Sequence, residues 1–323
     1  MTPLATEDEL LQSIRGILGN GIESFGLRDD AGVMSTPDGG SIVVSVDSVV
    51  DGVHVDLALC DPADVGWKAL MQALSDLAAM GAAPLGALVA LCVPGGSGEG
   101  ELALGVMHGV AEAAAATACP VVGGDVSEAP SLVAAVTVLG AVDGGTGDGG
   151  GAGGSGTPDP VSRAGAAPGD VLFVTGSCGG SAAGLRELRA GSPGADAAWS
   201  YRRPVARLRE GAAARRHGAH AMIDVSDGLA LDLHRLADAS GVGFALEDVP
   251  VAPGATFEEA LGGGEDYELV FAVGAGSADA LGSRFDTEGL REPTRLGVVA
   301  EDPDLRVLGT SPLDRLGWQH RVG

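Results

Sequence analysis

The sequence predicts an α/β protein with two domains, and three features lead to this fold class. The chain has 323 residues, more than the ~250–300 over which a single hydrophobic core usually extends. Segments of strand and helix character alternate in both halves, which favours α/β or α+β layers. A glycine-rich run, GGTGDGGGAGGSGT at 144–157, separates the halves. We expect an N-terminal domain at residues 1–143, a glycine-rich loop or linker at 144–160 and a C-terminal domain at 161–323.

The N-terminal half begins with a predicted helix at Thr6, because Glu9 three residues later completes a capping box. A second helix is expected to open at Asp61, with Pro62 in its first turn, and to stop at Gly81. Its apolar stripe consists of Leu70, Ala73, Leu74 and Leu77. The other expected elements are strands at 41–47, 85–93, 120–125 and 131–142 and a helix at 99–118.

The C-terminal half repeats this alternation. We expect strands at 169–176, 221–225, 243–247 and 266–273, and helices at 179–190, 204–217 and 227–240. The region of the second of these helices carries six arginines at helical spacing. A solvated helix face is the expected role, with a partner-facing surface as the alternative, for Arg202, Arg203, Arg207, Arg209, Arg215 and Arg216.

The charge balance narrows the possible functions. With 19 basic and 44 acidic residues the net charge is −25, and such a field repels nucleic acids and anionic membranes. We therefore expect neither as a partner. The sequence shows no signal peptide, no apolar run of the ~18 residues that a membrane helix needs, and four scattered cysteines that suit buried positions in a reducing compartment, so we expect a cytoplasmic protein.

Lys68 is the only lysine, and it does not lie in a GK[ST] phosphate-binding loop. If this acidic protein handles a phosphorylated ligand, metal ions have to supply much of the neutralising charge.

Aspartates recur where apolar strands end or helices begin, often beside glycine. Such positions are where open α/β folds bind ligands, and Mg²⁺ prefers oxygen ligands, so the set as a whole favours a metal site. Taken singly, each aspartate is as well explained as a helix cap or turn residue. The set is Asp29, Asp30, Asp47, Asp51, Asp76, Asp125, Asp224 and Asp227.

Three local motifs could carry chemistry. In IDVSDGLALDL, Asp224 ends a strand and Asp227 is expected to cap the next helix. In GGGEDYELVF, either Glu265 or Asp266 could face a ligand, although a plain glycine turn explains the run equally well. His54, in DGVHVD, is either a ligand contact or a satisfied strand histidine.

Taken in order, these runs resemble thiamine-monophosphate kinases. The matching segments are RDDAGV (28–33), SVDSVVDGVHVD (45–56), KALMQALSDLAAMGAAP (68–84), VVGGDVSEAP (121–130), RRPVARL (202–208), DVSDGLALDL (224–233) and GGGEDYELVF (262–271). The wider superfamily includes aminoimidazole ribonucleotide synthetase, selenophosphate synthetase and a hydrogenase-maturation protein.

The resemblance implies a two-domain architecture like that of aminoimidazole ribonucleotide synthetase, with N-terminal domains that pair through their sheets in a homodimer. It also implies transfer of the γ-phosphoryl group of ATP to thiamine monophosphate with several Mg²⁺ ions and without a catalytic general base, because the acceptor phosphate is itself anionic near neutral pH. The implied metal ligands are Asp30, Ser45, Val46 (through its backbone), Asp47, Asp76, Asp125, Asp224 and Asp227. Gly124, Asp125, Arg163 and Ser226 are the implied ATP contacts, and His54, Glu265 and Trp318 the implied thiamine contacts.

This chain departs from the family pattern at several positions. Arg28 stands where a glycine is usual, Val46 replaces a threonine and Glu128 replaces an arginine, and the tail GWQHRVG differs from the usual ending. Two other functions therefore stay open. One is a diverged enzyme of the superfamily that uses ATP on another phosphate monoester or on an amide or carboxyl oxygen. The other is a non-catalytic protein that binds nucleotide or divalent cations.

Overall fold

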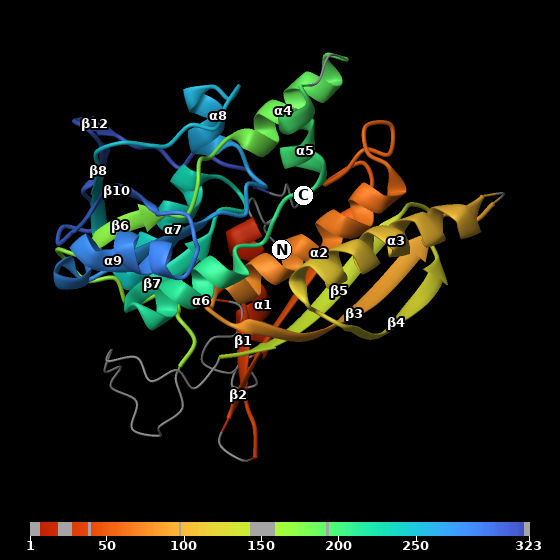
Figure 1. Ribbon diagram of the computed structural model, residues 1–323, viewed down its shortest axis with the longest axis horizontal. Helices are drawn as coiled ribbons and strands as arrows, with labels where there is room; N and C mark the ends of the chain where they lie inside the picture. The colour runs from red at the N-terminus through yellow and green to blue at the C-terminus, as the bar shows by residue number, and fades with distance from the viewer. Residues whose placement is uncertain are drawn as a thin grey trace.

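The computed structural model describes residues 7–18, 28–37, 40–96, 98–142, 159–191 and 194–319. The predicted helix start at Thr6 and the glycine-rich run at 144–157 lie outside these residues. Two β-sheets, each with its own helices, lie side by side in Figure 1. Strands from before the glycine-rich run form one sheet, and strands from after it form the other. An N-terminal helix, α1 (Glu7–Leu18), precedes the first sheet.

The N-terminal sheet has five strands in the order β1-β2-β5-β3-β4. Neighbouring strands are antiparallel except β3 and β4, which are parallel because helix α3 makes the crossover between them. The strands are β1 (Gly32–Ser35), β2 (Ser41–Val50), β3 (Ala83–Val93), β4 (Val121–Glu128) and β5 (Val133–Ala141).

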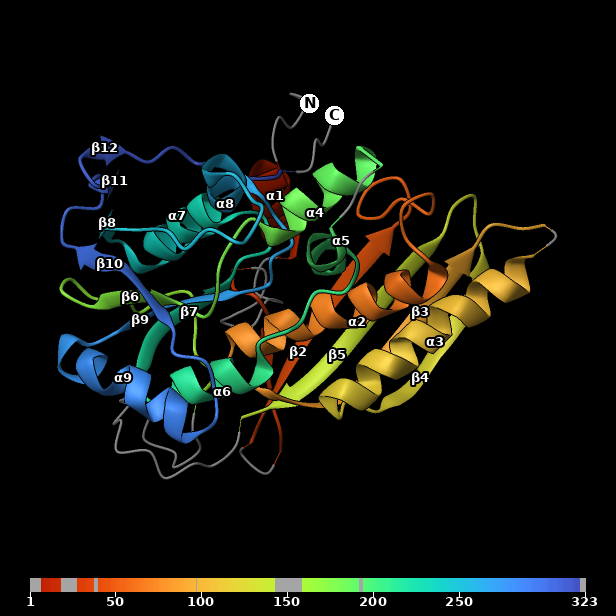
Figure 2. The same cartoon turned by 45° about the horizontal axis from the view of Figure 1, so that its top comes forward.

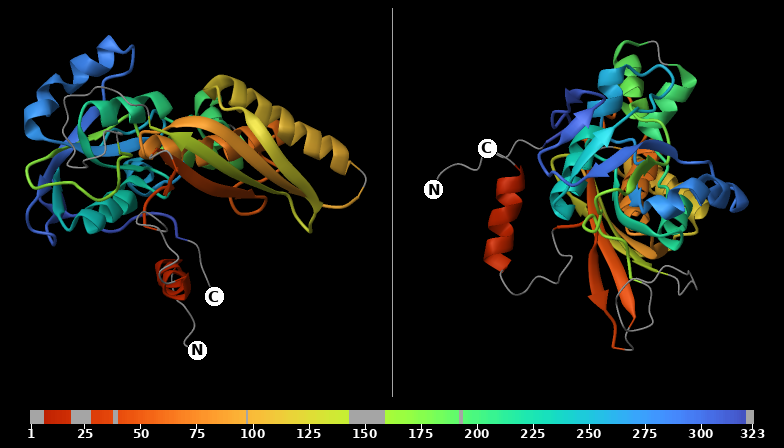
Figure 3. Two further views of the ribbon diagram at one scale, coloured as in Figure 1. Left: turned by 90° about the horizontal axis from the view of Figure 1, so that it is seen from below. Right: turned by 90° about the vertical axis from the view of Figure 1, so that its left-hand side faces the viewer.

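Two helices, α2 (Pro62–Ala79) and α3 (Glu99–Thr117), cover one face of this sheet, as Figure 3 shows. Helix α2 begins as expected after Asp61, whose backbone N–H donates to the Asp64 carboxylate at 3.2 Å. The other face of the sheet carries exposed apolar side chains: Val46 is 64% exposed and Leu88 41%, and both are level with Thr137 on β5. The N-terminal sheet is therefore packed on one face and open on the other.

The C-terminal sheet has seven strands in the order β12-β11-β8-β10-β6-β9-β7, antiparallel apart from the β11–β8 pair. The strands are β6 (Val171–Val174), β7 (Ala219–Asp224), β8 (Gly243–Leu246), β9 (Leu269–Val273), β10 (Thr294–Ala300), β11 (Arg306–Leu308) and β12 (Ser311–Pro312). Helices α7 (Leu229–Ser240) and α8 (Phe257–Gly262) contribute to the core on one face, and α6 (Leu208–Arg216) and α9 (Ala275–Thr287) to the core on the other.

The two domains share a packed boundary built around α2. Helices α4 (Gly180–Arg189) and α5 (Ala195–Arg202) follow the first strand of the C-terminal sheet, yet Leu188 and Tyr201 on them belong to the N-terminal core. Figure 2 shows α5 beside α2, which it contacts. Both halves of the chain therefore contribute to the N-terminal core.

The expected arginine-rich helix at 204–217 is shorter than predicted. Pro204 disfavours a helical conformation at Arg203, so α5 ends at Arg202 and α6 begins only at Leu208. The arginines do not form a solvated helix face either. Arg203 Nε donates to the Asp64 carboxylate at 2.7 Å, and two other arginines of the group donate to backbone carbonyls of the N-terminal domain. These further contacts are Arg202 Nε to the Leu59 carbonyl and Arg215 Nε to the Gly81 carbonyl.

Helices α2 and α3 approach each other closely at two glycines. A Cβ atom built on Gly109 would lie 1.7 Å from the Ala63 carbonyl oxygen, and one on Gly66 would lie 1.8 Å from the Val106 carbonyl oxygen. In both cases the obstacle is backbone, which can yield only if the helices separate.

We predict that Gly109→Ala lowers the free energy of unfolding by about 3 kcal/mol, because the added methyl group forces the two helices apart. Gly100→Ala is the matched control: it lies in the same helix with open space around it, and should raise stability by about 0.5–1 kcal/mol. Urea unfolding of both variants measures the difference, and equal stabilities would contradict the close packing.

Candidate functional site

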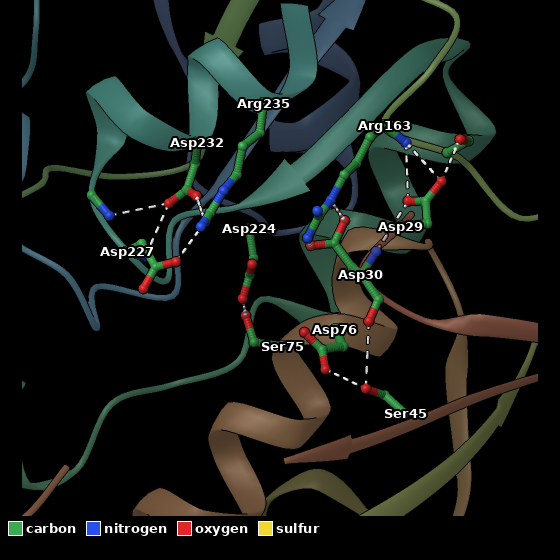
Figure 4. Close-up of polar contacts among 12 residues, drawn as sticks. Asp29, Asp30, Ser45, Ser75, Asp76, Arg163, Asp224, Asp227, Asp232 and Arg235 are labelled. Carbon is green, nitrogen blue, oxygen red and sulfur yellow. Dashed lines mark hydrogen bonds and ion pairs between the residues drawn. The ribbon is translucent and has the colours of Figure 1, made fainter. Parts of the chain in front are cut away.

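Three carboxylates from distant parts of the chain meet at the domain boundary. Asp30 precedes β1, Asp76 lies in the last part of α2, and Asp224 ends β7 in the C-terminal sheet. One oxygen from each lies within 4.8 Å of the others, and Figure 4 shows the three side chains converging. Oxygen ligands gathered in this way suit a hard divalent cation.

Burial and mutual repulsion disfavour the charged forms of this cluster. The pKa of Asp76 lies well above its ordinary value because the carboxyl is buried and because Asp47, Asp224 and Asp30 are nearby. The pKa of Asp224 is also raised, through burial and then the charge of Asp30. Two hydroxyls partly offset this: Ser45 donates to Asp76, and Ser75 donates to Asp224 at 2.6 Å.

Arg163 is the cation nearest to one side of the cluster. Its guanidinium binds the Asp30 carboxylate with two bonds, Nη2 to Oδ1 at 2.8 Å and Nε to Oδ2 at 3.1 Å. The neighbouring Asp29 instead accepts the Arg163 backbone N–H at 3.0 Å and the Ser162 hydroxyl. Asp29 therefore anchors the segment that carries Arg163, whereas Arg28 is exposed to solvent.

Asp227 lies on the other side of the cluster and does not cap helix α7 as expected. The N-cap residue is Gly228, and Asp232 in the first turn accepts the backbone N–H groups of Asp227 and Gly228 at 3.0 and 3.1 Å. Arg235 then pairs with both Asp232 and Asp227. The pKa of Asp232 is raised to about 6 by burial. The cap expected from Asp227 is thus supplied by Asp232, five residues later, and the Asp227 carboxylate is instead paired with Arg235 (Figure 4).

A cavity of about 490 Å³ joins the acidic cluster to the other predicted contacts. Both domains line it, Asp47 and Asp76 from the N-terminal domain and Ser226 and Asp227 from the C-terminal domain. The three predicted thiamine contacts, His54, Glu265 and Trp318, line the same cavity. The structure therefore places together most of the residues that the sequence singled out.

The turn before β9 separates the two acids that the sequence left as alternatives. Glu265 has φ +66° and Tyr267 φ +51°, both in the left-handed region that side chains other than glycine rarely adopt. Glu265 faces the cavity, whereas Asp266 accepts the backbone N–H groups of Gly179 and Ser181 at the start of α4. Burial raises the pKa of Asp266 to about 7. Glu265 is thus the cavity acid, and Asp266 holds α4.

Sequence reasoning missed a polar stripe on α2. Lys68, Gln72 and Ser75 are buried, and each contacts the C-terminal domain: Lys68 at Glu265, Gln72 at the Tyr267 hydroxyl and Ser75 at Asp224. Together with Asp76 they lie at helical spacing on the face opposite the apolar stripe. That spacing was readable from the sequence as a second, polar face.

Four residues that the sequence singled out lie apart from the cluster. Gly124 and Asp125 are on β4, the exposed edge strand, where Asp125 accepts the Ser127 hydroxyl at 2.9 Å. Val46 is on the open face of the N-terminal sheet, and Asp51 accepts the Leu57 backbone N–H within a turn.

All four cysteines are free; Cys60, Cys119 and Cys178 are buried and Cys92 is partly buried. In the part of the chain that the structure describes, none of the helices has the length and apolar character to cross a bilayer.

Comparison with known proteins agrees with this arrangement. Two family models match, the N-terminal domain of AIR synthase related proteins over residues 28–142 and the C-terminal domain over 167–309. The thiamine-monophosphate kinase of Bacillus subtilis is 32% identical over 91% of this chain and 93% of its own, and that of Rhodopirellula baltica is 34% identical over 91% and 89%. A solved complex of AaThiL with AMPPCP and TMP superposes with a TM-score of 0.81 at 27% identity, covering 98% of this chain and 97% of its own. The chain therefore belongs to the thiamine-monophosphate kinase family of the AIR synthase related proteins.

Proposed function

We propose that the protein transfers the γ-phosphoryl group of ATP to thiamine monophosphate, producing thiamine diphosphate. The observation that supports this most strongly is that one cavity between the domains is lined by His54, Glu265 and Trp318 and also by Asp76, a member of the carboxylate cluster. Similarity to the named kinases, and to a structure that binds AMPPCP and TMP, points to the same reaction. The cytoplasmic location remains a prediction from the sequence.

The carboxylate cluster fits Mg²⁺ ions, which the reaction would require. Asp30, Asp76 and Asp224 would hold them, with Asp47 and Asp227 on the same cavity. Burial and repulsion raise the pKa of Asp76 and of Asp224, so a cation between these groups would relieve an unfavourable charge distribution. Held by these carboxylates, such ions would supply positive charge to neutralise the negative charge that develops during transfer.

The protein's own residues then have to bind and align two anionic substrates. The acceptor phosphate has a second pKa near ~6, so it is a nucleophile at neutral pH without a general base. Arg163 and Ser226 remain the proposed ATP contacts. His54, Glu265 and Trp318 would hold the thiamine end, which leaves the phosphate of the acceptor free to face the carboxylate cluster.

A homodimer would complete the site. Asp47 on β2 aligns with Val136 on β5, then Val89 on β3, then Gly124 on β4. Three strand spacings of about 4.8 Å place Asp47 roughly 14 Å from Gly124 and its neighbour Asp125, too far to share one ion.

We therefore propose that Asp125 and Gly124 serve the site of a second subunit. The open apolar face around Val46 and Leu88 would be covered in that dimer, and Asp125 and Gly124 lie on the strand at the edge of that sheet.

A mass-detected assay with ATP, Mg²⁺ and thiamine monophosphate tests the reaction, with free thiamine as the control acceptor. We expect thiamine diphosphate from the monophosphate only, and none after metal is removed with a chelator. Binding of ATP that depends on Mg²⁺, without this product, would point to another acceptor. Failure to bind ATP at all would favour a non-catalytic role.

Asp76→Asn and Asp224→Asn should each reduce turnover on the order of 100-fold or more, because each removes a charged ligand from the cluster. Neither should lose thermal stability without metal, since each also removes a source of repulsion, and the stabilisation that Mg²⁺ gives the wild type should disappear. Asp170→Asn is the control, a buried carboxylate outside the cavity that bonds to His220. Near-normal turnover in either cluster variant would remove that residue from the metal site.

Mixing subunits tests the proposed dimer. Asp76→Asn and Asp125→Asn should be inactive alone, but co-refolded subunits should recover about a quarter of wild-type activity, since half of random dimers are mixed and each has one complete site. If Asp125 acted within its own subunit, no mixed dimer would have a complete site. Activity that stays at the level of the separate variants would therefore reject the shared site.

A further inference from the structure

Lys68 is the only lysine of the chain, and it is almost completely buried, with 1% of its side chain exposed. Its ammonium has three partners: the Glu265 carboxylate at 2.8 Å, the His54 carbonyl at 3.3 Å and the face of the Tyr201 ring, 4.1 Å from the centroid. Burying an ammonium costs free energy unless it is paired and hydrogen-bonded, and here those conditions are met.

The partners of Lys68 come from separate segments around the cavity. Lys68 itself is on α2, His54 is in the loop after β2, Tyr201 is on α5, and Glu265 is in the turn before β9 of the C-terminal domain. The Tyr201 hydroxyl also donates to the His54 carbonyl, at 3.4 Å. His54, Tyr201 and Glu265 all line the cavity, whereas Lys68 lies behind them. The ammonium therefore joins the segments that form this wall without being part of its surface.

The pair with Lys68 also defines what Glu265 can recognise. The backbone of Glu265 is in the left-handed region, its N–H donates to the Ser226 carbonyl at 2.7 Å and its carboxylate pairs with Lys68, so both the backbone and the side chain are held. A carboxylate that is already paired with an ammonium is close to neutral as a unit. Such a pair suits a neutral N–H donor of a ligand, such as an aromatic amine, better than a second full cation.

We propose that Lys68 is a positioning residue for acceptor recognition, which acts through Glu265 to select a ligand with a neutral N–H donor. This inference rests on the proposed function, because it concerns the part of the cavity assigned to the thiamine end of the acceptor. A purely structural lysine would stabilise the domain boundary and affect both substrates alike.

A double-mutant cycle separates these two roles. Lys68→Met keeps the aliphatic stem and removes the charge, leaving Glu265 unpaired; we expect the KM for thiamine monophosphate to rise about tenfold or more, with the KM for ATP and kcat changed by less than about threefold. Glu265→Gln should show a similar split. The double variant should be no worse than Glu265→Gln alone, within about twofold, because Lys68 acts through that carboxylate.

Arg306→Met provides the control. It removes an ion pair to Asp238 of 2.6 Å on the far side of the C-terminal domain and should leave both KM values unchanged. Effects of Lys68→Met and Glu265→Gln that multiply in the double variant, or equal rises in the KM for ATP and for the acceptor, would overturn the inference.

A second measurement uses the single lysine directly and needs no variant. Selective ¹⁵N-lysine labelling should give one side-chain ammonium signal in the NMR spectrum, that of Lys68. We expect thiamine monophosphate to shift this signal in a saturable way and MgATP alone to leave it unchanged. A signal that moves equally with MgATP, or that does not respond to thiamine monophosphate, would overturn the inference.

The two proposals fail in different ways. A wild-type enzyme that makes no thiamine diphosphate overturns the proposed function. The Lys68 signal then still decides the inference, since a saturable shift with thiamine monophosphate supports it and no shift rejects it. A wild-type enzyme that is active, with multiplying effects in the cycle, overturns the role of Lys68 alone.

Discussion

Negative charge buried at the domain boundary is the constraint on which the arrangement of the site depends. Asp30, Asp76 and Asp224 lie within 4.8 Å of one another, and burial and repulsion raise the pKa of both Asp76 and Asp224. Without partners, such a cluster would favour separation of the domains that supply it. The fold offsets this with a small set of polar contacts, in which Arg163 binds Asp30, Ser45 binds Asp76 and Ser75 binds Asp224. A divalent cation would complete the neutralisation, which makes ligand binding and domain contact parts of the same electrostatic balance.

Helix α2 organises this boundary because it is buried on two opposite faces. Its apolar stripe, which includes Leu70 and Leu74, packs in the N-terminal core. The opposite stripe of Lys68, Gln72, Ser75 and Asp76 contacts the C-terminal domain or the acidic cluster. One rigid helix thus fixes the spacing between the proposed thiamine end of the cavity at Lys68 and the carboxylate cluster at Asp76. Over eight residues at ~1.5 Å each, that spacing is about 12 Å along the helix axis.

Local sequence patterns predicted much of this architecture. Alternating strand and helix signals located β2 to β9 and α2, α3, α4 and α7, and Asp61 with Pro62 marked the start of α2. Strand β1, helices α5, α8 and α9 and strands β10 to β12 were missed; most of them are short, and short elements depend on packing more than on local pattern. The cap of α7 was misassigned because Asp232 lies within the helix, where sequence rules do not look for an N-cap.

The sequence allowed the metal-binding character of the site to be predicted, but not which of its side chains pair with one another. Aspartates at strand ends indicated a metal site, and the structure brings Asp30, Asp76 and Asp224 together. The pairing of Arg235 with Asp227, or of Lys68 with Glu265, depends on which loops the tertiary fold places side by side. Asp125 shows the opposite case: its motif is clear in the sequence, yet the strand order places it far from Asp47 within one chain.

The net charge of −25 affects how the protein can bind its proposed substrates. Both proposed substrates are anions, and the field of the whole protein opposes their approach, although salt at physiological strength screens it beyond about 8 Å. Attraction therefore has to be generated inside the cavity. Arg163 and Arg235, which do not line the cavity, are already bound to aspartates, so they keep the acidic ligands in place more than they add net positive charge. Lys68 lies behind the cavity wall and is paired with Glu265, and Arg189 is the one arginine among the described residues that line the cavity. One arginine does not balance two phosphorylated molecules, so metal ions have to bring most of the positive charge, and the buried carboxylates are the part of the fold that attracts those ions.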